Sequence, residues 1–227
     1  ELEVAYADAR QLLPADDIAG HAELLMSYGS RQLHLGRIDV AAGLHQQAID
    51  MAMAHGQTQV INRFRVGYLM SFNAAGRLRQ IIELLDAAGD DWRTRPVDTE
   101  NFMSRAYYGL MLIWMGRLDE ARQHLHAAMD VANREQGLSM SWMYSGLVDL
   151  ALLNGDFASA MAPAEQGMQR AEQSGSPFMR AIALRALGLA LGLNDRHAEG
   201  VEALSEALPM VTQGGLAYFF EANVLAT

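Results

Sequence analysis

One short pattern recurs along the chain at an almost constant spacing, and it constrains the fold more than any other feature of the sequence. A glycine followed by Arg or Asp stands at Gly36, Gly76, Gly116 and Gly155, and Asp195 holds the fifth place. The intervals are 40, 40, 39 and 40 residues. A period of this length is typical of arrays in which one supersecondary unit stacks on the next.

Each of these markers separates two apolar runs that have helical spacing. In the third unit, Leu110 and Trp114 precede Gly116, and Ala121 and Leu125 follow it. Nothing between the markers alternates with period two, as a half-buried strand would. Each unit is therefore predicted to be a helix, a tight turn and a second helix, with the glycine reversing the chain.

Small residues recur at three places around the marker, which are seven residues before it, five after it and twelve after it. In the third unit they are Gly109, Ala121 and Ala128. Small side chains there let the two helices of one unit, and the next unit, approach closely. We therefore predict an all-α fold, a right-handed superhelical array (α-solenoid) of about five helix-turn-helix repeats.

The markers also set the predicted organisation, a single repeat domain over residues 1–227. The second repeat is irregular, because Gly89-Asp90-Asp91 shortens its second helix, and we interpret the loop to Thr99 as a longer connection rather than a functional loop. The chain begins without Met and ends in an apolar stretch, so we expect a fragment of a larger protein. The predicted segments are the end of a preceding repeat at 1–16, repeats at about 17–56, 57–96, 97–137, 138–175 and 176–214, and the start of a further helix at 215–227.

The three small positions resemble the tetratricopeptide pattern over nearly the whole chain. Two departures are the period of about 40 residues instead of 34 and the replacement of the usual closing proline by Met53, Asn133 and Glu172. The longer units, such as LIWMGRLDEARQHLHAAMDVANREQG, are similar to the repeat region of MalT-like bacterial signalling ATPases, which include LuxR-type transcriptional activators. Similar arrays follow ATPase modules in some bacterial adenylate cyclases and kinases.

Composition limits the partners and the location. There are 27 Asp and Glu against 17 Lys and Arg, giving a net charge of −10, and such a surface repels phosphate backbones. No run approaches the ~18 apolar residues of a membrane span, and there is no cysteine that would indicate disulfides. We expect no direct nucleic-acid binding, no membrane contact and a cytoplasmic location.

No spacing of polar residues predicts a catalytic or metal centre. Ser145 lies inside a predicted helix, where no strand-to-helix turn would present it as a nucleophile. His124 and His126 stand about 200° apart on a helix, and His45 and His55 are also wrongly spaced for one ion. We expect no enzymatic activity, no cofactor and no metal, with the histidines at the surface or at interfaces.

Methionine and tryptophan provide the candidate binding surface. If the first helices line a concave wall, as in tetratricopeptide arrays, its positions recur 13, 10, 6, 3 and 2 residues before each marker. Large, soft side chains there suit varied apolar partners, whereas the alternative, which we keep open, is that they form core. The candidate binding residues are Arg63, Met70, Asn73, Met103, Arg105, Trp114, Trp142, Asp149 and Arg185.

Arginines on the first helices indicate a second kind of contact. Arg63, Arg65 and Arg105 lie on adjacent first helices, and Arg180 and Arg185 follow in the fifth unit. Aligned guanidinium groups can clamp a carboxylate or phosphate with two hydrogen bonds. The alternative is that they pair with neighbouring acids or lie along the helix surface, which is commoner.

These observations favour a non-enzymatic scaffold or sensor module of a bacterial signalling protein or transcriptional regulator. It would bind a protein, peptide or small effector in its concave groove and contact other domains of the parent protein. The alternative is a structural array that oligomerises or regulates an attached enzyme such as an adenylate cyclase or kinase. This alternative includes a homo-oligomer, which we keep open.

Overall fold

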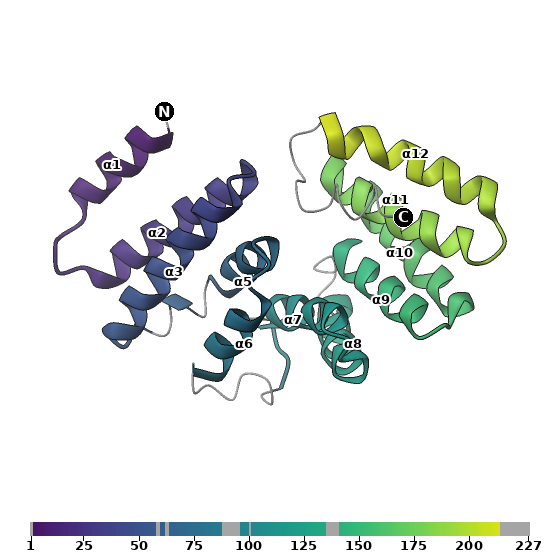
Figure 1. Cartoon of the computed structure of the whole chain (residues 1–227), viewed down its shortest axis with the longest axis horizontal. Coiled ribbons are helices and arrows are strands. Elements are labelled where there is room, and N and C mark those ends of the chain that lie inside the picture. The colour runs from purple at the N-terminus through teal and green to yellow at the C-terminus, as the bar shows by residue number, and fades with distance from the viewer. Residues whose placement is uncertain are drawn as a thin grey trace. The chain divides into compact units, whose positions relative to one another are not determined.

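The computed structural model of the protein describes residues 2–57, 60–61, 64–87, 96–99, 101–134 and 141–213. These residues contain helices and no strand, which confirms the predicted all-α, tetratricopeptide-like fold class (Figure 1). The handedness of the array and the repeat boundaries stay predictions. The helices are α1 (Leu2–Leu12), α2 (Ile18–His34), α3 (Ile38–Ala54), α5 (Arg65–Ala74), α6 (Leu78–Ala87), α7 (Phe102–Trp114), α8 (Leu118–Arg134), α9 (Ser141–Leu153), α10 (Phe157–Ser174), α11 (Pro177–Gly192) and α12 (His197–Gln213).

The turns at the five markers share one backbone geometry. The four marker glycines have φ between 70° and 73°, and Asp195 has φ 62°. This left-handed conformation costs glycine little, because it has no Cβ. In each turn the residue after the marker donates its N–H to the carbonyl five residues earlier, for example from Arg117 to Leu112 at 2.9 Å. This hydrogen bond closes the first helix and directs the chain into the second.

Large side chains pack over the glycines that stand seven residues before the marker. A Cβ on Gly109 would lie 2.8 Å from Cγ of Leu125, and one on Gly188 would lie 2.7 Å from Cγ of Leu204. Ala121 and Ala128, the predicted small residues of the second helix, are fully buried. The predicted small positions of the third unit therefore lie where its two helices cross.

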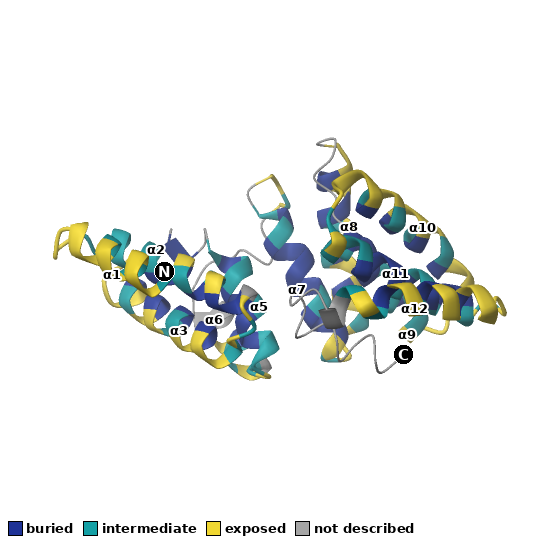
Figure 2. Ribbon diagram, turned by 90° about the horizontal axis from the view of Figure 1, so that it is seen from above, coloured by how far each residue is buried: buried dark blue, intermediate teal, exposed yellow. Residues whose placement is uncertain are grey.

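Buried and exposed residues alternate along most helices with the helical period. Figure 2 shows α8, α10 and α12 with dark blue inner faces and yellow outer faces. The first helix α7 differs, because nearly all of its residues are buried. The second helices therefore present the charged surface, and the first helices hold most of the core.

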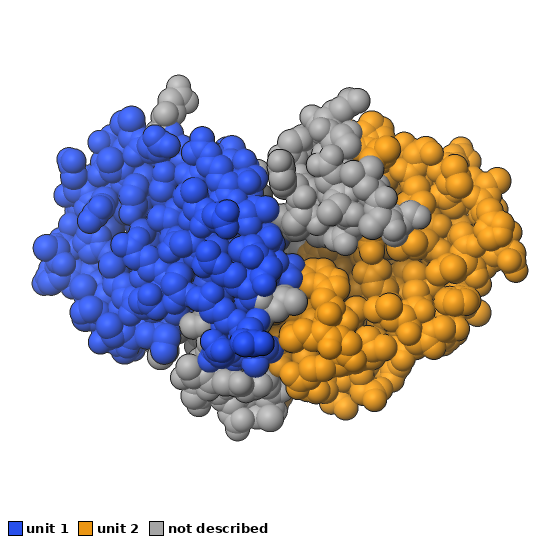
Figure 3. Space-filling model, in the orientation of Figure 1, with its two compact units in different colours: residues 1–92 blue, residues 93–227 orange. Residues whose placement is uncertain are grey.

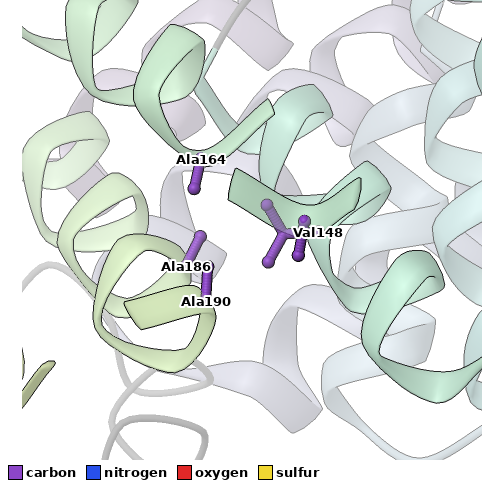
Figure 4. Packing of buried hydrophobic residues seen from close by; sticks show 5 residues of the cluster. Val148, Ala164, Ala186 and Ala190 are labelled. Carbon is purple, nitrogen blue, oxygen red and sulfur yellow. The ribbon is translucent and has the colours of Figure 1, made fainter. Parts of the chain in front are cut away.

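The chain divides into two compact units, residues 1–92 and residues 93–227 (Figure 3). Unit 1 contains α1 to α6, and unit 2 contains α7 to α12. Within unit 2, small residues from three helices meet in one cluster: Val148 of α9, Ala164 of α10, and Ala186 and Ala190 of α11 point toward one another (Figure 4). The first helix of the last repeat thus packs against both helices of the repeat before it.

Three predicted features lie outside the described residues. They are the irregular segment around Gly89-Asp90-Asp91, the candidate residue Arg63, and the further helix at 215–227.

Candidate functional site

The candidate site lies on the first helices of unit 2. Helices α7, α9 and α11 belong to consecutive helix pairs, and α9 contacts both of the others. The positions predicted from the markers fall within about 100° on each helix, because residues three, four and seven apart share a face. We call these positions on the three helices the first-helix wall.

An ion pair joins the two later helices of this wall. Nη1 of Arg185 lies 3.2 Å from Oδ1 and 3.4 Å from Oδ2 of Asp149, and it donates to Oγ of Ser145 at 3.5 Å. Only 14% of the Arg185 side chain and 20% of the Asp149 side chain are exposed. Two sequence-predicted residues are therefore brought together, and they pair with each other.

Burial raises the pKa of the Asp149 carboxyl, and the adjacent Arg185 guanidinium lowers it by less. Nε of Arg185 is also buried, and it has no hydrogen-bond partner in the described part of the chain. Removing these charges from water costs free energy that their attraction only partly returns. The ion pair therefore serves to fix the position of α11 against α9.

Trp142 lies between the core and the surface. Its ring is half-buried and meets the ring of Tyr107 edge-on, with centroids 6.1 Å apart. Nearby on the same wall, a Cβ on Gly146 would overlap the side chain of Leu110, so α7 and α9 are closely packed. Met103 is half-buried as well. Trp142 and Met103 therefore fit the core and the binding-surface interpretations in part, because each side chain is packed on one side and leaves some apolar surface accessible.

The turn end of the wall is exposed and apolar. Trp114, Leu153 and Leu193 stand two residues before successive markers and are 45%, 60% and 46% exposed. The side-chain amide of Asn194 donates to the carbonyl of Phe157 at 2.7 Å, which holds the last two turns together. We call Trp114, Leu153 and Leu193 the apolar row. Leu153 and Leu193 were missed as candidates, although their position relative to the marker is that of Trp114.

The four described arginines of this set do not form an exposed clamp. Arg65 and Arg105 are buried, with 4% and 6% of their surface exposed, and burial lowers the pKa of Arg105. Arg180 forms an ion pair with Glu206 at 2.5 Å, and Arg185 pairs with Asp149. For these last two residues the alternative interpretation, pairing with neighbouring acids, is correct. Arg65 and Arg105 can be buried between packed helices because most of an arginine side chain is an aliphatic chain.

The remaining candidates belong to unit 1. Met70 and Asn73 lie on α5 and are half-buried. They are not part of the wall that α7, α9 and α11 form.

One histidine departs from the prediction that all of them lie at the surface or at interfaces. His45 on α3 is fully buried. It takes the place over Gly29 that leucine takes over Gly109 and Gly188, with its Cδ2 2.7 Å from a Cβ built on that glycine. An imidazole is close to leucine in size, so it fits this position once its nitrogens have hydrogen-bond partners.

Residues 102–173 match the family model for the tetratricopeptide repeat. The match covers about a third of the chain and includes α7, α8, α9 and most of α10. No curated protein matches the chain. The match supports a tetratricopeptide-like helical repeat in the part of the chain that carries the wall, and repeats of this kind generally mediate protein–protein interaction.

Two further searches concern the described residues only. None of their helices combines the length and apolarity that crossing a bilayer requires. Among the same residues, no three acidic or histidine side chains gather in a way that would hold a metal ion.

Proposed function

We propose that this protein is a non-enzymatic scaffold that binds a protein partner through the first-helix wall of unit 2. The observation that carries the proposal is the apolar row: one repeat position presents a large, exposed apolar side chain on three consecutive helix pairs. Single exposed apolar residues are ordinary on a protein surface, but a contiguous set of them is typical of an interaction site.

The row suits one face of a partner helix. Packed helices lie about 8 to 10 Å apart, so equivalent residues on α7, α9 and α11 would repeat at roughly that spacing. On an amphipathic helix, side chains seven residues apart lie on one face and are about 10 Å apart along the axis. Such a helix lying across the turns would contact Trp114, Leu153 and Leu193 in succession.

The ion pair contributes less to binding in this proposal. Asp149 and Arg185 already pair with each other and are mostly buried, so little of either side chain is accessible to a partner. Tryptophan, by contrast, is enriched among the residues that dominate interface affinity. Truncating Trp114 should therefore weaken binding more than replacing Arg185, provided that the fold is intact.

The experiment uses a photo-crosslinking residue placed in turn at positions 114 and 153. Crosslinked proteins are identified by mass spectrometry, and each purified partner is then titrated against the wild type. We expect Trp114→Ala with Leu153→Ala to reduce affinity by at least tenfold. The melting temperature should fall less than for a fully buried leucine such as Leu125→Ala, since 45% of Trp114 and 60% of Leu153 are exposed.

Val201 supplies the matched control. It is an apolar residue of α12 that is 64% exposed, and it lies outside the wall. Val201→Ala should leave the affinity unchanged. The wall would be excluded as the binding surface if Val201→Ala reduced the affinity as much as the Trp114→Ala and Leu153→Ala variant. It would also be excluded if a partner crosslinked equally well at position 201.

We also propose a cytoplasmic signalling or transcriptional context of the MalT-like, LuxR-type kind. The repeat period of about 40 residues supports it, as do segments such as LIWMGRLDEARQHLHAAMDVANREQG. The alternative is an array that oligomerises or regulates an attached enzyme. Light scattering of the purified chain separates the two: a concentration-independent oligomer favours the alternative, and a monomer that gains mass only with a partner favours the scaffold.

A further inference from the structure

His45 occupies the point where three helices of unit 1 meet. Its Nε2 lies 3.1 Å from the carbonyl oxygen of Met26 on α2 and 3.3 Å from Oγ of Ser30. Its Nδ1 lies 2.7 Å from Oγ of Ser71 on α5. The imidazole therefore connects α3 to both neighbours from a position that water does not reach.

The partners determine which nitrogen gains a proton. A carbonyl oxygen can only accept, so Nε2 carries a hydrogen in either charge state, and Nδ1 is the atom that titrates. In the neutral form, the Ser71 hydroxyl donates to Nδ1. In the protonated form, Nδ1 donates to Oγ of Ser71, and the hydroxyl turns to the carbonyl of Tyr68, which is 3.0 Å away. The same groups can thus hydrogen-bond both forms.

Charge, not hydrogen bonding, then decides which form the closed packing favours. None of the partners that the described residues give His45 is a carboxylate. The titratable groups on α5 are Arg65 and Tyr68, both of them buried. In the part of the chain that the structure describes, the hydrogen-bond partners of His45 do not include the other titratable groups of α2, α3 and α6, or the residue that follows α3. Those groups are His21, Glu23, Tyr28, Arg31, Asp39, Asp50, His55, Arg79 and Glu83.

We propose that His45 makes unit 1 acid-responsive, so that its protonation opens the junction of α2, α3 and α5. The open form exposes the imidazole to water, where the cation is solvated, whereas the closed form holds it among neutral groups. Acidification therefore favours the open form, and unit 2, which has leucine at the equivalent positions 125 and 204, does not respond in this way.

The direction follows from proton linkage. Burial lowers the pKa of His45 below its ordinary value of about 6.5, and the hydrogen bond to Met26 offsets only part of this. The closed form then binds fewer protons than the open form as pH falls below 6.5, so stability is lost in that range. One such proton changes the opening equilibrium by at most about tenfold between pH 7.5 and pH 5.5.

The test is hydrogen exchange of the full chain at pH 7.5 and 5.5, after correction for intrinsic exchange rates. We expect protection in α2, α3 and α5 to fall severalfold, and by at most about tenfold, relative to α10. His45→Leu should abolish this difference, because leucine fills the same position in other repeats and leaves no titrating group. His55→Gln, which removes an exposed histidine from the C-terminal end of the same helix, should leave the difference unchanged.

Two results would overturn the proposal. One is a His45→Leu variant in which acidification lowers the protection of α2, α3 and α5 as much as it does in the wild type. The other, which needs no variant, is an imidazole that titrates at its ordinary pKa in the wild type without loss of protection. If His45→Leu does not fold, the titration of His45 in the wild type decides: its midpoint should lie below about 6.5, and a midpoint at or above that value contradicts the inference.

Discussion

The closest approach between two helices in unit 2 leads to a sharp prediction about Gly200. A Cβ at this position of α12 would lie 2.8 Å from the carbonyl oxygen of Gly188 and 3.0 Å from the backbone nitrogen of Gly192. Both atoms belong to the backbone of α11, so they cannot give way as a side chain would. Gly200→Ala must therefore push the two helices apart.

The magnitude is a balance of two terms. Alanine favours a helix interior over glycine by about 1 kcal/mol, whereas overpacking a close contact costs roughly 1 to 3 kcal/mol. Because backbone is the obstacle, we expect the upper part of that range and a net loss of about 1 to 2 kcal/mol. Gly192→Ala is the control, since its added Cβ would meet nothing within 4 Å, and it should be neutral or slightly stabilising.

Urea unfolding followed by the fluorescence of Trp114 and Trp142 reports on unit 2 in a Trp92→Phe background, which removes the tryptophan of unit 1. Circular dichroism follows the helices. Gly109→Ala provides a third point between the two extremes. Its Cβ would meet Cγ of Leu125 at 2.8 Å, a side chain that can shift, so its loss should be smaller than that of Gly200→Ala. If Gly200→Ala were as stable as Gly192→Ala, the helices would not cross at Gly188 and Gly200, and the packing argument would be wrong.

Three other variants test separate features of unit 2 by the same unfolding assay. Arg185→Met leaves the carboxylate of Asp149 half-buried without its cation and should cost roughly 1 to 3 kcal/mol at pH 7, with a smaller loss at pH 4, where the carboxyl takes up a proton. Asp195→Gly should stabilise by about 0.5 to 1 kcal/mol, because Asp195 is the only described non-glycine residue with positive φ. Leu125→Ala should cost roughly 2 to 5 kcal/mol, whereas Leu153→Ala, which is 60% exposed, should stay within about 0.5 kcal/mol.

The sequence was sufficient for the fold because its strongest signals are local. The marker glycines indicate a left-handed backbone conformation that few other residues adopt. The helical spacing of apolar residues indicates which face of each helix lies in the core. Asp195 shows the strength of this signal, since it has the same turn geometry without a glycine. The position of each turn was therefore predictable from the spacing alone.

The site was less predictable, because exposure depends on neighbouring helices. Arg105 lies on a first helix beside apolar residues, and nothing local distinguishes an arginine that faces solvent from one buried along its aliphatic part. The pairing of Arg185 with Asp149 joins positions 36 residues apart, so it follows only from how α9 and α11 stack. His45 was missed because a polar residue gives no apolar signal even when it occupies a core position.

In the first, third, fourth and fifth repeats, a pair of facing positions holds one small and one larger residue, so the combined volume varies less than the residue at either position. Where the position seven residues before the marker is glycine, as at Gly109 and Gly188, the facing position nine residues after it is leucine. In the fourth repeat the sizes are exchanged, and Val148 faces Ala164 (Figure 4). Close packing explains the exchange, since two helices at a fixed separation admit one large side chain between them but not two. His45 over Gly29 has the size that this packing requires, but unlike leucine it can take up a proton. In our proposal, this difference makes the first repeat respond to acid.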